Sequence, residues 1–443
     1  MVTHIVVGAG IAGLMAAREA AIRNEQVIVV EATPQPGGLV HSVTLAGITV
    51  DAGAEAFSIT DDAVLALCAE LNLDDVEFAA ESGSCIVSGP DRYDIPKGVF
   101  GIPTSIGELR AVAVLSDAEI EHARQLDSAP LTHISETISV ANLVRARLGE
   151  PILEKFVRPI VAGVHGGAVE DIEVRALVPR LLPELRRTGS LCSAAHNVRG
   201  LSAAPGAAVA TIRGGLTRLI DALVGDLSCR GVKVLTSIAV DAVTKSNGYW
   251  RVEADGVTLG YADRVTLAVP AYRAAVIVAG FPALARALDT INYSDATVGI
   301  AVVHAPQLDT FPLKSGALVV GDPLVKATTH VTAKWPWRSG ELPHPVHILR
   351  FSFDGAASRS EAAQQLIERG VHCMYGLDSH AILDSHIVRW PRSLVAPVAS
   401  HSARINQIRD IAEKAGIFLV GSYMNGNGVT GIVRSALNER TSV

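Results

Sequence analysis

The first 31 residues show a regular change in the spacing of their apolar positions. Residues 3–7 and 26–30 are short apolar runs, and the stretch between them opens with glycines and then repeats apolar residues every three or four positions. Continuous apolar runs are typical of strands buried on both faces, and the wider spacing is typical of an amphipathic helix. The pattern predicts a strand, a glycine turn, a helix and a second strand, the βαβ unit of a parallel sheet.

In the rest of the chain the apolar residues are spaced differently. Residues 102–204 carry helical spacing, as in ETISVANLVRARLGEPILEKFV, whereas residues 75–101 and 271–400 alternate short β-like runs such as TVGIAVVHA and HIVRW with turns. The second pattern predicts a sheet. Residues 211–243 predict a helix followed by two strands, and 264–270 a buried strand. The end of the chain, LVGSYMNGNGVTGIV (419–433), predicts a strand, a glycine loop and a helix.

Composition limits the class of protein. The 443 residues exceed what one hydrophobic core normally supports, so two or three domains are expected. The net charge of -7 provides no basic surface for nucleic acid. Five scattered cysteines without a CxxC spacing, and fourteen dispersed histidines, predict neither a disulfide framework nor a metal site. Residues 264–280 form the longest apolar stretch, which a proline and an arginine interrupt. We therefore expect a soluble, cytoplasmic protein without a signal peptide or a transmembrane segment.

The glycine turn has the spacing of a dinucleotide site. Gly8, Gly10 and Gly13 form GxGxxG directly after the first strand. In this motif the glycines permit a tight turn, close approach of a pyrophosphate and close packing of helix on strand, and the helix N-terminus holds the phosphates. Glu31 ends the second strand, where a carboxylate accepts ribose hydroxyls and repels a ribose phosphate, so NADP is not expected. A tight structural turn is the alternative, and it would need no acid at Glu31.

Further glycines indicate which dinucleotide the chain binds. Gly37 and Gly38 form a second backbone-exposing turn, and ITVDAGAE places a third glycine loop after a strand. A single nucleotide does not need three such loops. FAD, whose ring lies far from its adenine, is therefore the expected cofactor.

Several blocks of sequence carry a resemblance to a known family. They are VDAGAEAF (50–57), IPKGVFGIPTSIGEL (95–109), FVRPIVAGVHGGAVEDIEVRALVPRL (156–181), TIRGGLTRLIDAL (211–223), RWPRSLVAPVASH (389–401) and FLVGSYMNGNGVTGI (418–432). With the opening glycine motif, they resemble the flavoprotein family of amine oxidases and porphyrinogen oxidases, and within it the bacterial protoporphyrinogen and coproporphyrinogen oxidases of haem synthesis. Leu39 departs from the basic residue that usually follows the Gly-Gly pair.

The resemblance implies a mixed α/β fold with three domains. A Rossmann-type FAD domain would combine residues 1–74, 205–270 and 401–443. A β-sheet substrate domain would combine 75–101 with 271–400, and 102–204 would form a helical domain. The implied contacts of FAD include the backbone of Val240 at the adenine, Trp390 near the ring, and the N–H groups of Val429 and Thr430 at its pyrimidine end. The full set of predicted cofactor residues is Gly8, Gly10, Ile11, Ala12, Gly13, Glu31, Ala32, Gly37, Gly38, Leu39, Gly53, Ala54, Glu55, Val240, Trp390, Gly421, Ser422, Val429 and Thr430.

The chain contains no GxSxG, HExxH or GxxxxGK[ST] motif, and porphyrinogen oxidation does not need a strong protein base. Pyrrole nitrogen electrons push hydride out, so a flavin can accept it, and no catalytic side chain is predicted. Propionates need cations, for which Lys97, Arg158 and Arg350 are candidates. The resemblance implies that Ile160 and Gly163 line the ring cavity.

The expected reaction is the six-electron oxidation of coproporphyrinogen III to coproporphyrin III, with oxygen as acceptor and hydrogen peroxide as product. The next enzyme of haem synthesis is a candidate partner, and the sequence leaves the oligomeric state open. Three alternatives remain: protoporphyrinogen IX as substrate, an amine oxidase, which should show an aromatic cage beside the flavin, and a flavin-containing carrier that passes tetrapyrroles on without oxidising them. With 5% aromatic residues the chain offers little for such a cage.

Overall fold

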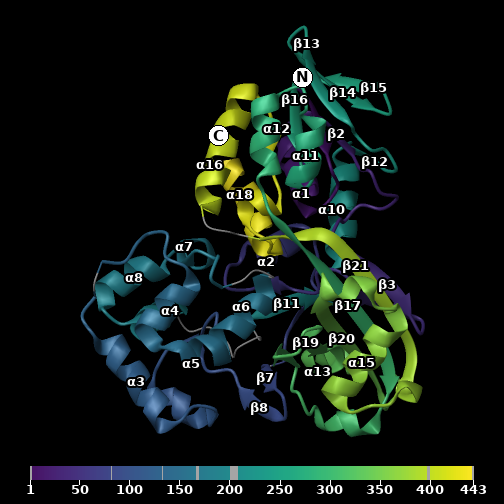
Figure 1. Cartoon of the computed structure of the whole chain (residues 1–443). Helices are drawn as coiled ribbons and strands as arrows, with labels where there is room; N and C mark the ends of the chain where they lie inside the picture. The colour runs from purple at the N-terminus through teal and green to yellow at the C-terminus, as the bar shows by residue number, and fades with distance from the viewer. Residues whose placement is uncertain are drawn as a thin grey trace.

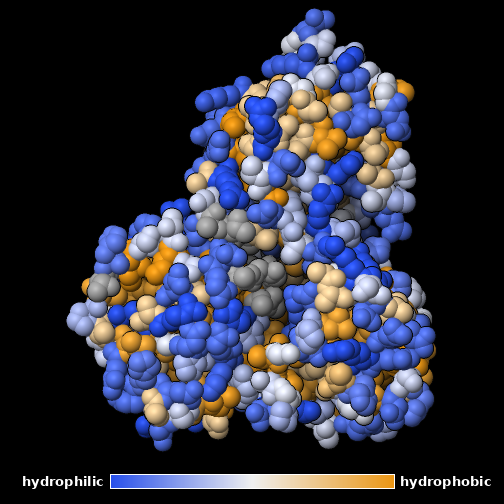
Figure 2. Space-filling model, viewed as in Figure 1, coloured by the Kyte–Doolittle hydropathy of each residue, from blue (hydrophilic) through white to orange (hydrophobic). Residues whose placement is uncertain are grey.

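The computed structural model describes residues 2–80, 82–131, 133–165, 169–199, 208–396 and 400–441. The chain forms three regions around a common centre, and both termini lie in the uppermost region of Figure 1. A helical region lies at the lower left and a sheet region at the lower right. Hydrophilic residues dominate the face seen in Figure 2, and hydrophobic ones show in separate patches. No helix in the described ranges is long and apolar enough to cross a membrane.

The uppermost region is built on a five-stranded parallel sheet of order β12-β2-β1-β16-β22. Its strands come from distant parts of the chain: β1 (Thr3–Val7), β2 (Gln26–Val30), β12 (Lys233–Leu235), β16 (Arg264–Leu267) and β22 (Phe418–Leu419). The β1 and β2 strands and the helix between them confirm the predicted βαβ unit. The strand β22, predicted from the apolar residues before the last glycine loop, pairs in parallel with β16.

Helices cover both faces of this sheet, which is why its strands are apolar on both sides. One face packs against α1 (Ile11–Ile22), α10 (Thr217–Cys229) and α18 (Val429–Thr441). The other packs against α11 (Ala271–Ile277), α12 (Pro282–Asp289), α16 (His401–Ala415) and the antiparallel sheet β13 (Ala242–Ser246), β14 (Tyr249–Ala254) and β15 (Val257–Ala262). Residues 236–241, where the sequence predicted part of a second strand, follow β12 without joining a sheet.

The sheet region has seven strands in the order β21-β17-β20-β19-β18-β7-β8. They are β7 (Cys85–Ser88), β8 (Asp91–Asp94), β17 (Tyr293–His304), β18 (Gly316–Val320), β19 (Val325–His330), β20 (Val346–Asp354) and β21 (Ile382–Val395). The predicted runs TVGIAVVHA and HIVRW lie in β17 and β21. One face packs against α15 (Ala363–Tyr375). The other packs against α13 (Val331–Lys334), α14 (Pro336–Ser339) and the hairpin of β3 (Ser42–Leu45) and β4 (Ile48–Asp51).

The helical region has its own core. It contains α3 (Asp117–Ser128), α4 (Val140–Leu148), α5 (Glu150–Ile152), α6 (Arg158–His165), α7 (Val174–Leu177), α8 (Leu181–Thr188) and α9 (Leu191–Arg199). One turn of π-helix, Leu153–Val157, connects α5 to α6. The helical spacing over 102–204 therefore predicted these elements correctly, although not the π turn.

Smaller elements connect the regions. Helix α2 (Ala63–Glu70) and a three-stranded sheet of β5 (Phe57–Ser58), β11 (Val209–Ile212) and β6 (Val76–Phe78) lie below the parallel sheet. The strands β9 (Gly98–Val99) and β10 (Ile102–Pro103) pair with each other, and α17 (Ser422–Asn425) precedes α18. Four short 3-10 segments complete the described elements: Gly107–Val112, Pro306–Thr310, Ala357–Ser360 and Ser379–Ala381. The mixed α/β fold class predicted from the sequence is confirmed.

Candidate FAD site

Two glycines of the opening motif are required by the protein itself. Gly8 has a φ of 102°, and a Cβ on it would lie 2.6 Å from the carbonyl oxygen of Ala268. A Cβ on Gly13 would lie 1.9 Å from the carbonyl oxygen of Gly8. Any side chain at either position would therefore force the β1–α1 turn away from its neighbours.

Gly10 is a glycine for another reason. It has an ordinary φ of -69°, and a Cβ on it would meet only the Gly37 carbonyl oxygen, at 4.0 Å. Neither the backbone nor the packing requires glycine there, so the open space in front of it fits a ligand that approaches the backbone closely. Gly10 is also the N-cap of α1 and has no side chain to cap the first turn, to which Ile11 and Ala12 contribute N–H groups. An anion such as a pyrophosphate satisfies these groups and interacts favourably with the helix dipole.

The Glu31 carboxylate braces this loop. It is 8% exposed, and its Oε2 accepts a 2.7 Å hydrogen bond from the Ala9 N–H while its Oε1 accepts from the N–H and hydroxyl of Thr33. Ala32 beside it is exposed. The segment that follows β12 runs past this point, with the Ile238 N–H donating to the Glu31 carbonyl, and it carries the buried Val240. The role of Glu31 toward the ribose stays a prediction, and the sequence did not reveal its bond to the loop.

The second glycine turn lies directly against the first. Gly37 and Gly38 both have positive φ, 127° and 59°, and the Gly37 N–H donates to the Ala9 carbonyl at 2.9 Å. The chain then passes through Leu39, which is 40% exposed, to the third turn. There the Ala54 N–H donates to the Leu39 carbonyl at 2.8 Å, and a Cβ on Gly53 would lie 1.9 Å from that same oxygen. The three glycine loops thus form one continuous line of backbone.

Trp390 and the C-terminal segment contact the chain at the third turn and just after it. The Trp390 indole donates to the Ala52 carbonyl at 3.1 Å, and its ring meets the edge of His41. Gly421, with a φ of 133°, precedes Ser422 and α17. Val429 begins α18 and is buried, and the hydroxyl of Thr430 donates to the Ser58 carbonyl at 2.9 Å.

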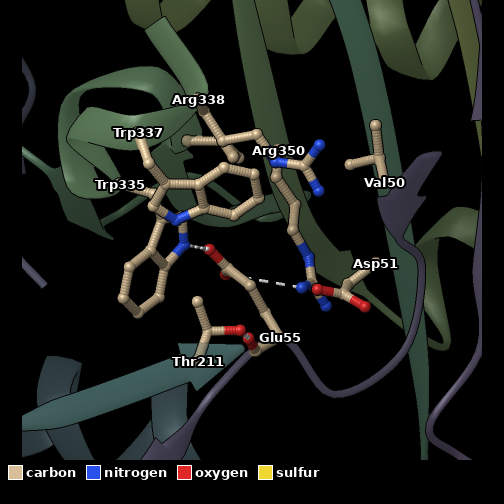
Figure 3. A pocket seen from close by; sticks show the side chains of 9 residues that line it. Val50, Asp51, Glu55, Thr211, Trp335, Trp337, Arg338 and Arg350 are labelled. Carbon is tan, nitrogen blue, oxygen red and sulfur yellow. Dashed lines mark hydrogen bonds and ion pairs between the residues drawn. The ribbon is translucent and has the colours of Figure 1, made fainter. Parts of the chain in front are cut away.

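Glu55 is oriented differently from the other predicted cofactor residues. Figure 3 shows its carboxylate directed toward Trp335 and Arg350 in a closed polar pocket. The Trp335 indole donates to its Oε1 at 2.6 Å, and Lys334 and Arg350 lie 3.5 and 3.4 Å from its Oε2. Burial raises the pKa of Glu55, but the two cations and the indole hydrogen bond outweigh it, so the pKa lies below its ordinary value. The carboxylate is therefore ionised, and its contacts with Trp335, Lys334 and Arg350 connect the turn to the sheet region.

Asp51, at the start of the same turn, titrates differently. Burial, followed by the charge of Glu55, raises its pKa to about 7, although Arg350 and the N–H of Leu216 oppose the change. The Leu216 N–H donates to its Oδ1 at 3.0 Å. The sequence contained no signal for this pair of acids with opposite pKa changes, because their partners lie far away in the chain.

Comparison with known proteins decides the family. Residues 11–439 match the family described as flavin containing amine oxidoreductase. The chain belongs to this family. It is therefore an FAD-dependent oxidoreductase, and the cofactor and the class of enzyme predicted from the sequence are confirmed.

Individual members of the flavin containing amine oxidoreductase family are similar over the whole chain. A coproporphyrinogen III oxidase of Mycobacterium tuberculosis is 28% identical over 456 residues, covering 100% of this chain and 97% of the relative. A coproporphyrinogen III oxidase of Bacillus subtilis is 23% identical, covering 96% and 94%. In fold, the chain resembles a putative protoporphyrinogen oxidase from Exiguobacterium sp. 255-15, with a TM-score of 0.85 and 22% identity over 99% of this chain and 98% of the other.

The predicted substrate residues of this flavoprotein differ in how they are engaged. Lys97 is exposed, and it has no ion pair to any residue in the described ranges. Arg158 instead pairs with Glu154 at 2.7 Å and with Glu170 at 2.6 Å. Arg350 is 12% exposed and lies 3.4 Å from Glu55. The structure therefore leaves Lys97 as the available cation among these three. The glutamate four residues before Arg158 was the sequence signal that its charge is paired.

The predicted ring-cavity residues both lie on α6. Ile160 is half-buried there. Gly163 falls within the bounds of the helix, but its surroundings lie outside the part that the structure describes. Both assignments stay predictions.

Proposed function

We propose that this flavoprotein oxidises coproporphyrinogen III to coproporphyrin III in the cytoplasm. The observation that carries the proposal is the similarity, over essentially the full length of both chains, to relatives named coproporphyrinogen III oxidase. Bound FAD, which the glycine loops would hold, supplies the flavin chemistry that this reaction needs. Scattered cysteines, none placed for a disulfide framework, support a reducing compartment.

The reaction removes six hydrogens from the macrocycle in three two-electron steps. Bound FAD supplies the hydride acceptor, and three molecules of oxygen take up the six electrons as three of hydrogen peroxide. The pyrrole nitrogens provide the electron push and then lose their protons, so no strong protein base is required. The work of the chain is to bind FAD through the three glycine loops, to present the substrate in a fixed orientation and to keep water out.

Binding the substrate requires cations because coproporphyrinogen III carries four propionates. Lys97 supports this role, since its ammonium group is exposed and can form charge-assisted hydrogen bonds with a carboxylate. Ile160 on α6 offers an apolar contact for the macrocycle. The enzyme that next acts on coproporphyrin is the partner that such a product requires.

The test uses the purified protein with FAD in two experiments. In air, porphyrin fluorescence is followed after addition of coproporphyrinogen III or, separately, protoporphyrinogen IX. Without oxygen, bleaching of the flavin absorbance is followed after the same additions. We expect bleaching, and coproporphyrin forming several times faster than protoporphyrin. A variant that cannot bind FAD, Gly10→Val, is the control for spontaneous oxidation.

Each alternative has its own outcome. Faster formation of protoporphyrin would make protoporphyrinogen IX the substrate, in line with a 27% identical relative named chloroplastic protoporphyrinogen oxidase in rice. Bleaching by an amine such as putrescine, but by neither porphyrinogen, would make the protein an amine oxidase. Porphyrinogen binding without bleaching would leave a tetrapyrrole carrier. Any of these results would contradict the proposal.

A further inference from the structure

The turn over residues 52–55 is held by hydrogen bonds along both of its sides. On one side, the N–H groups of Ala52 and Gly53 donate to the His41 carbonyl at 2.8 and 3.2 Å, and the Ala54 N–H donates to the Leu39 carbonyl. These bonds connect the turn to the chain that follows the Gly37–Gly38 turn. These bonds therefore fix the position of the third glycine loop relative to the second.

On the other side, the turn is held by residues of other elements. The Ala52 carbonyl accepts from Trp390 of β21, the Gly53 carbonyl accepts from Arg350 of β20, and the Glu55 carbonyl accepts from Thr211 of β11 at 2.9 Å. Two of these three donors belong to the seven-stranded sheet. The sheet region thus holds a loop of the cofactor region by its backbone.

Arg350 has a double role in this contact. One of its terminal nitrogens donates to the Gly53 carbonyl, and the other lies 3.4 Å from the Glu55 carboxylate. Both side chains are 12% exposed. Figure 3 shows the two groups facing each other, with Asp51 on the far side of Arg350. A planar guanidinium directs its two terminal nitrogens at both acceptors in a fixed fork, a geometry that a single ammonium on a flexible stem lacks.

Burying this ion pair is unfavourable because both charges lose their hydration. Their mutual attraction offsets that loss only if their geometry is good. Here the cluster satisfies that condition: Glu55 also accepts from the Trp335 indole and lies beside Lys334. Stabilisation of the fold does not explain this unfavourable burial of charge, since well-packed apolar residues would stabilise the fold equally well. It is explained if the turn must be held in one exact position.

We propose that Arg350 and Glu55 are positioning residues for FAD: together they hold the turn over residues 52–55 in the place at which the flavin end of the cofactor binds. The inference rests on the FAD site of the proposed function and not on its porphyrinogen substrate. It predicts that removing the pair weakens FAD binding more than it weakens the fold of the apoprotein. Arg350, a candidate propionate anchor by sequence, acts in this proposal on the cofactor site.

The variants separate positioning from charge balance. Arg350→Met removes the guanidinium and leaves the Glu55 carboxylate with Lys334 as its remaining cation of the two. The double variant Arg350→Met/Glu55→Gln removes both charges, so that Glu55 is not left as an unpaired carboxylate. Arg350→Lys keeps the charge but loses the rigid fork that directs two N–H groups at both acceptors. Lys326→Met is the matched control, because Lys326 lies on the neighbouring strand β19 and pairs with Asp354 away from the turn.

Two measurements are made on each full-length protein: the dissociation constant of FAD, from quenching of flavin fluorescence, and the Tm with and without FAD. We expect the dissociation constant to rise by about tenfold or more in Arg350→Met and in the double variant, which corresponds to about 1.4 kcal/mol. Arg350→Lys should fall between these and the wild type, and Lys326→Met should match the wild type. The rise in Tm on adding FAD should shrink in the same order.

The proposal is overturned if the double variant or Arg350→Lys binds FAD as tightly as the wild type. It is also overturned if the Tm falls equally with and without FAD, since that result describes a purely structural pair. Because no porphyrinogen is present, a protein that fails to oxidise porphyrinogens can still pass this test. Conversely, an active oxidase can fail it.

Discussion

Three residues of one motif show how the same amino acid serves different purposes. Gly8 is required by its backbone angle and its contact with Ala268, and Gly13 is required by helix packing, whereas Gly10 faces open space that fits the predicted contact with the cofactor. The sequence spacing identifies all three together. Only the position of a hypothetical Cβ distinguishes the structural glycines from the one that serves a ligand.

This difference predicts opposite results for one substitution at two sites. Gly10→Val should leave the apoprotein folded, with a Tm close to that of the wild type, but should abolish FAD binding. Gly13→Val should destabilise the apoprotein by several kcal/mol, because its Cβ would overlap the Gly8 carbonyl. Circular dichroism of the apoproteins and an FAD titration measure both effects. Equal stability of the two variants would contradict the assignment.

Asp51 predicts a dependence of stability on pH. Its folded pKa, about 7, lies above its ordinary value of 3.8, so the folded state binds the proton more tightly than the unfolded chain does. The contribution of Asp51 to stability is therefore greatest below pH 4 and is lost as the pH rises through 7. Asp51→Asn should remove this dependence, because an amide oxygen can still accept from the Leu216 N–H.

The measurement is urea unfolding of the apoprotein at pH 5 and pH 8. Relative to the wild type, Asp51→Asn should be more stable at pH 8 than at pH 5 by about 3 kcal/mol at most, one pKa unit being worth about 1.4 kcal/mol. Asp384→Asn, which changes an acid on β21, serves as the control and should show a smaller change. The same difference between variant and wild type at both pH values would contradict the prediction.

At the scale of elements, one side chain connects the glycine-rich loop before α18 to the seven-stranded sheet. The Asn427 side chain lies between α17 and α18 and exchanges two hydrogen bonds with the backbone of Val395, at the end of β21, both 2.9 Å long. This amide imitates a short strand pairing and joins the last helices to the seven-stranded sheet. The sequence showed the loop but not this partner, which lies 32 residues earlier.

Asn427→Ala should therefore lower the free energy of unfolding by about 2 kcal/mol, because two buried backbone groups lose their partners. Asn406→Ala is the control, since Asn406 lies on α16 and bonds only to an exposed arginine, so it should change stability by less than about 0.5 kcal/mol. Chemical denaturation of the two variants makes the comparison. Equal effects would show that the Asn427 bonds do not stabilise the fold.

At the scale of the whole molecule, three distant parts of the chain form the parallel sheet that carries the proposed FAD site. The parallel sheet takes strands from the first 30 residues, from 233–267 and from the last 26 residues, and the seven-stranded sheet holds the loop over 52–55. A ligand that contacts all of these segments binds only when they are assembled. FAD binding and global folding should therefore be coupled.

This coupling predicts a Tm that rises with the concentration of FAD. Free FAD at one hundred times its dissociation constant should stabilise the wild-type protein by about 2.7 kcal/mol. Gly10→Val should show no such rise. Thermal unfolding over a series of FAD concentrations measures it, and a Tm that is independent of FAD would contradict a site built from separate segments.

The sequence alone determined the βαβ unit, the three glycine loops, the acid at Glu31 and the flavoprotein class. These features depend on spacings of a few residues, and the local backbone geometry that such spacings require is the same wherever they occur. Only the tertiary structure decided that Glu55 turns into a cluster with Trp335 and Arg350, that Arg158 is paired and that Arg350 donates to the Gly53 carbonyl. Arg350 and Gly53 lie 297 residues apart, so their contact depends on how the whole chain packs. A charged side chain looks the same in a sequence whether it is free or paired, because its partner is chosen by the fold.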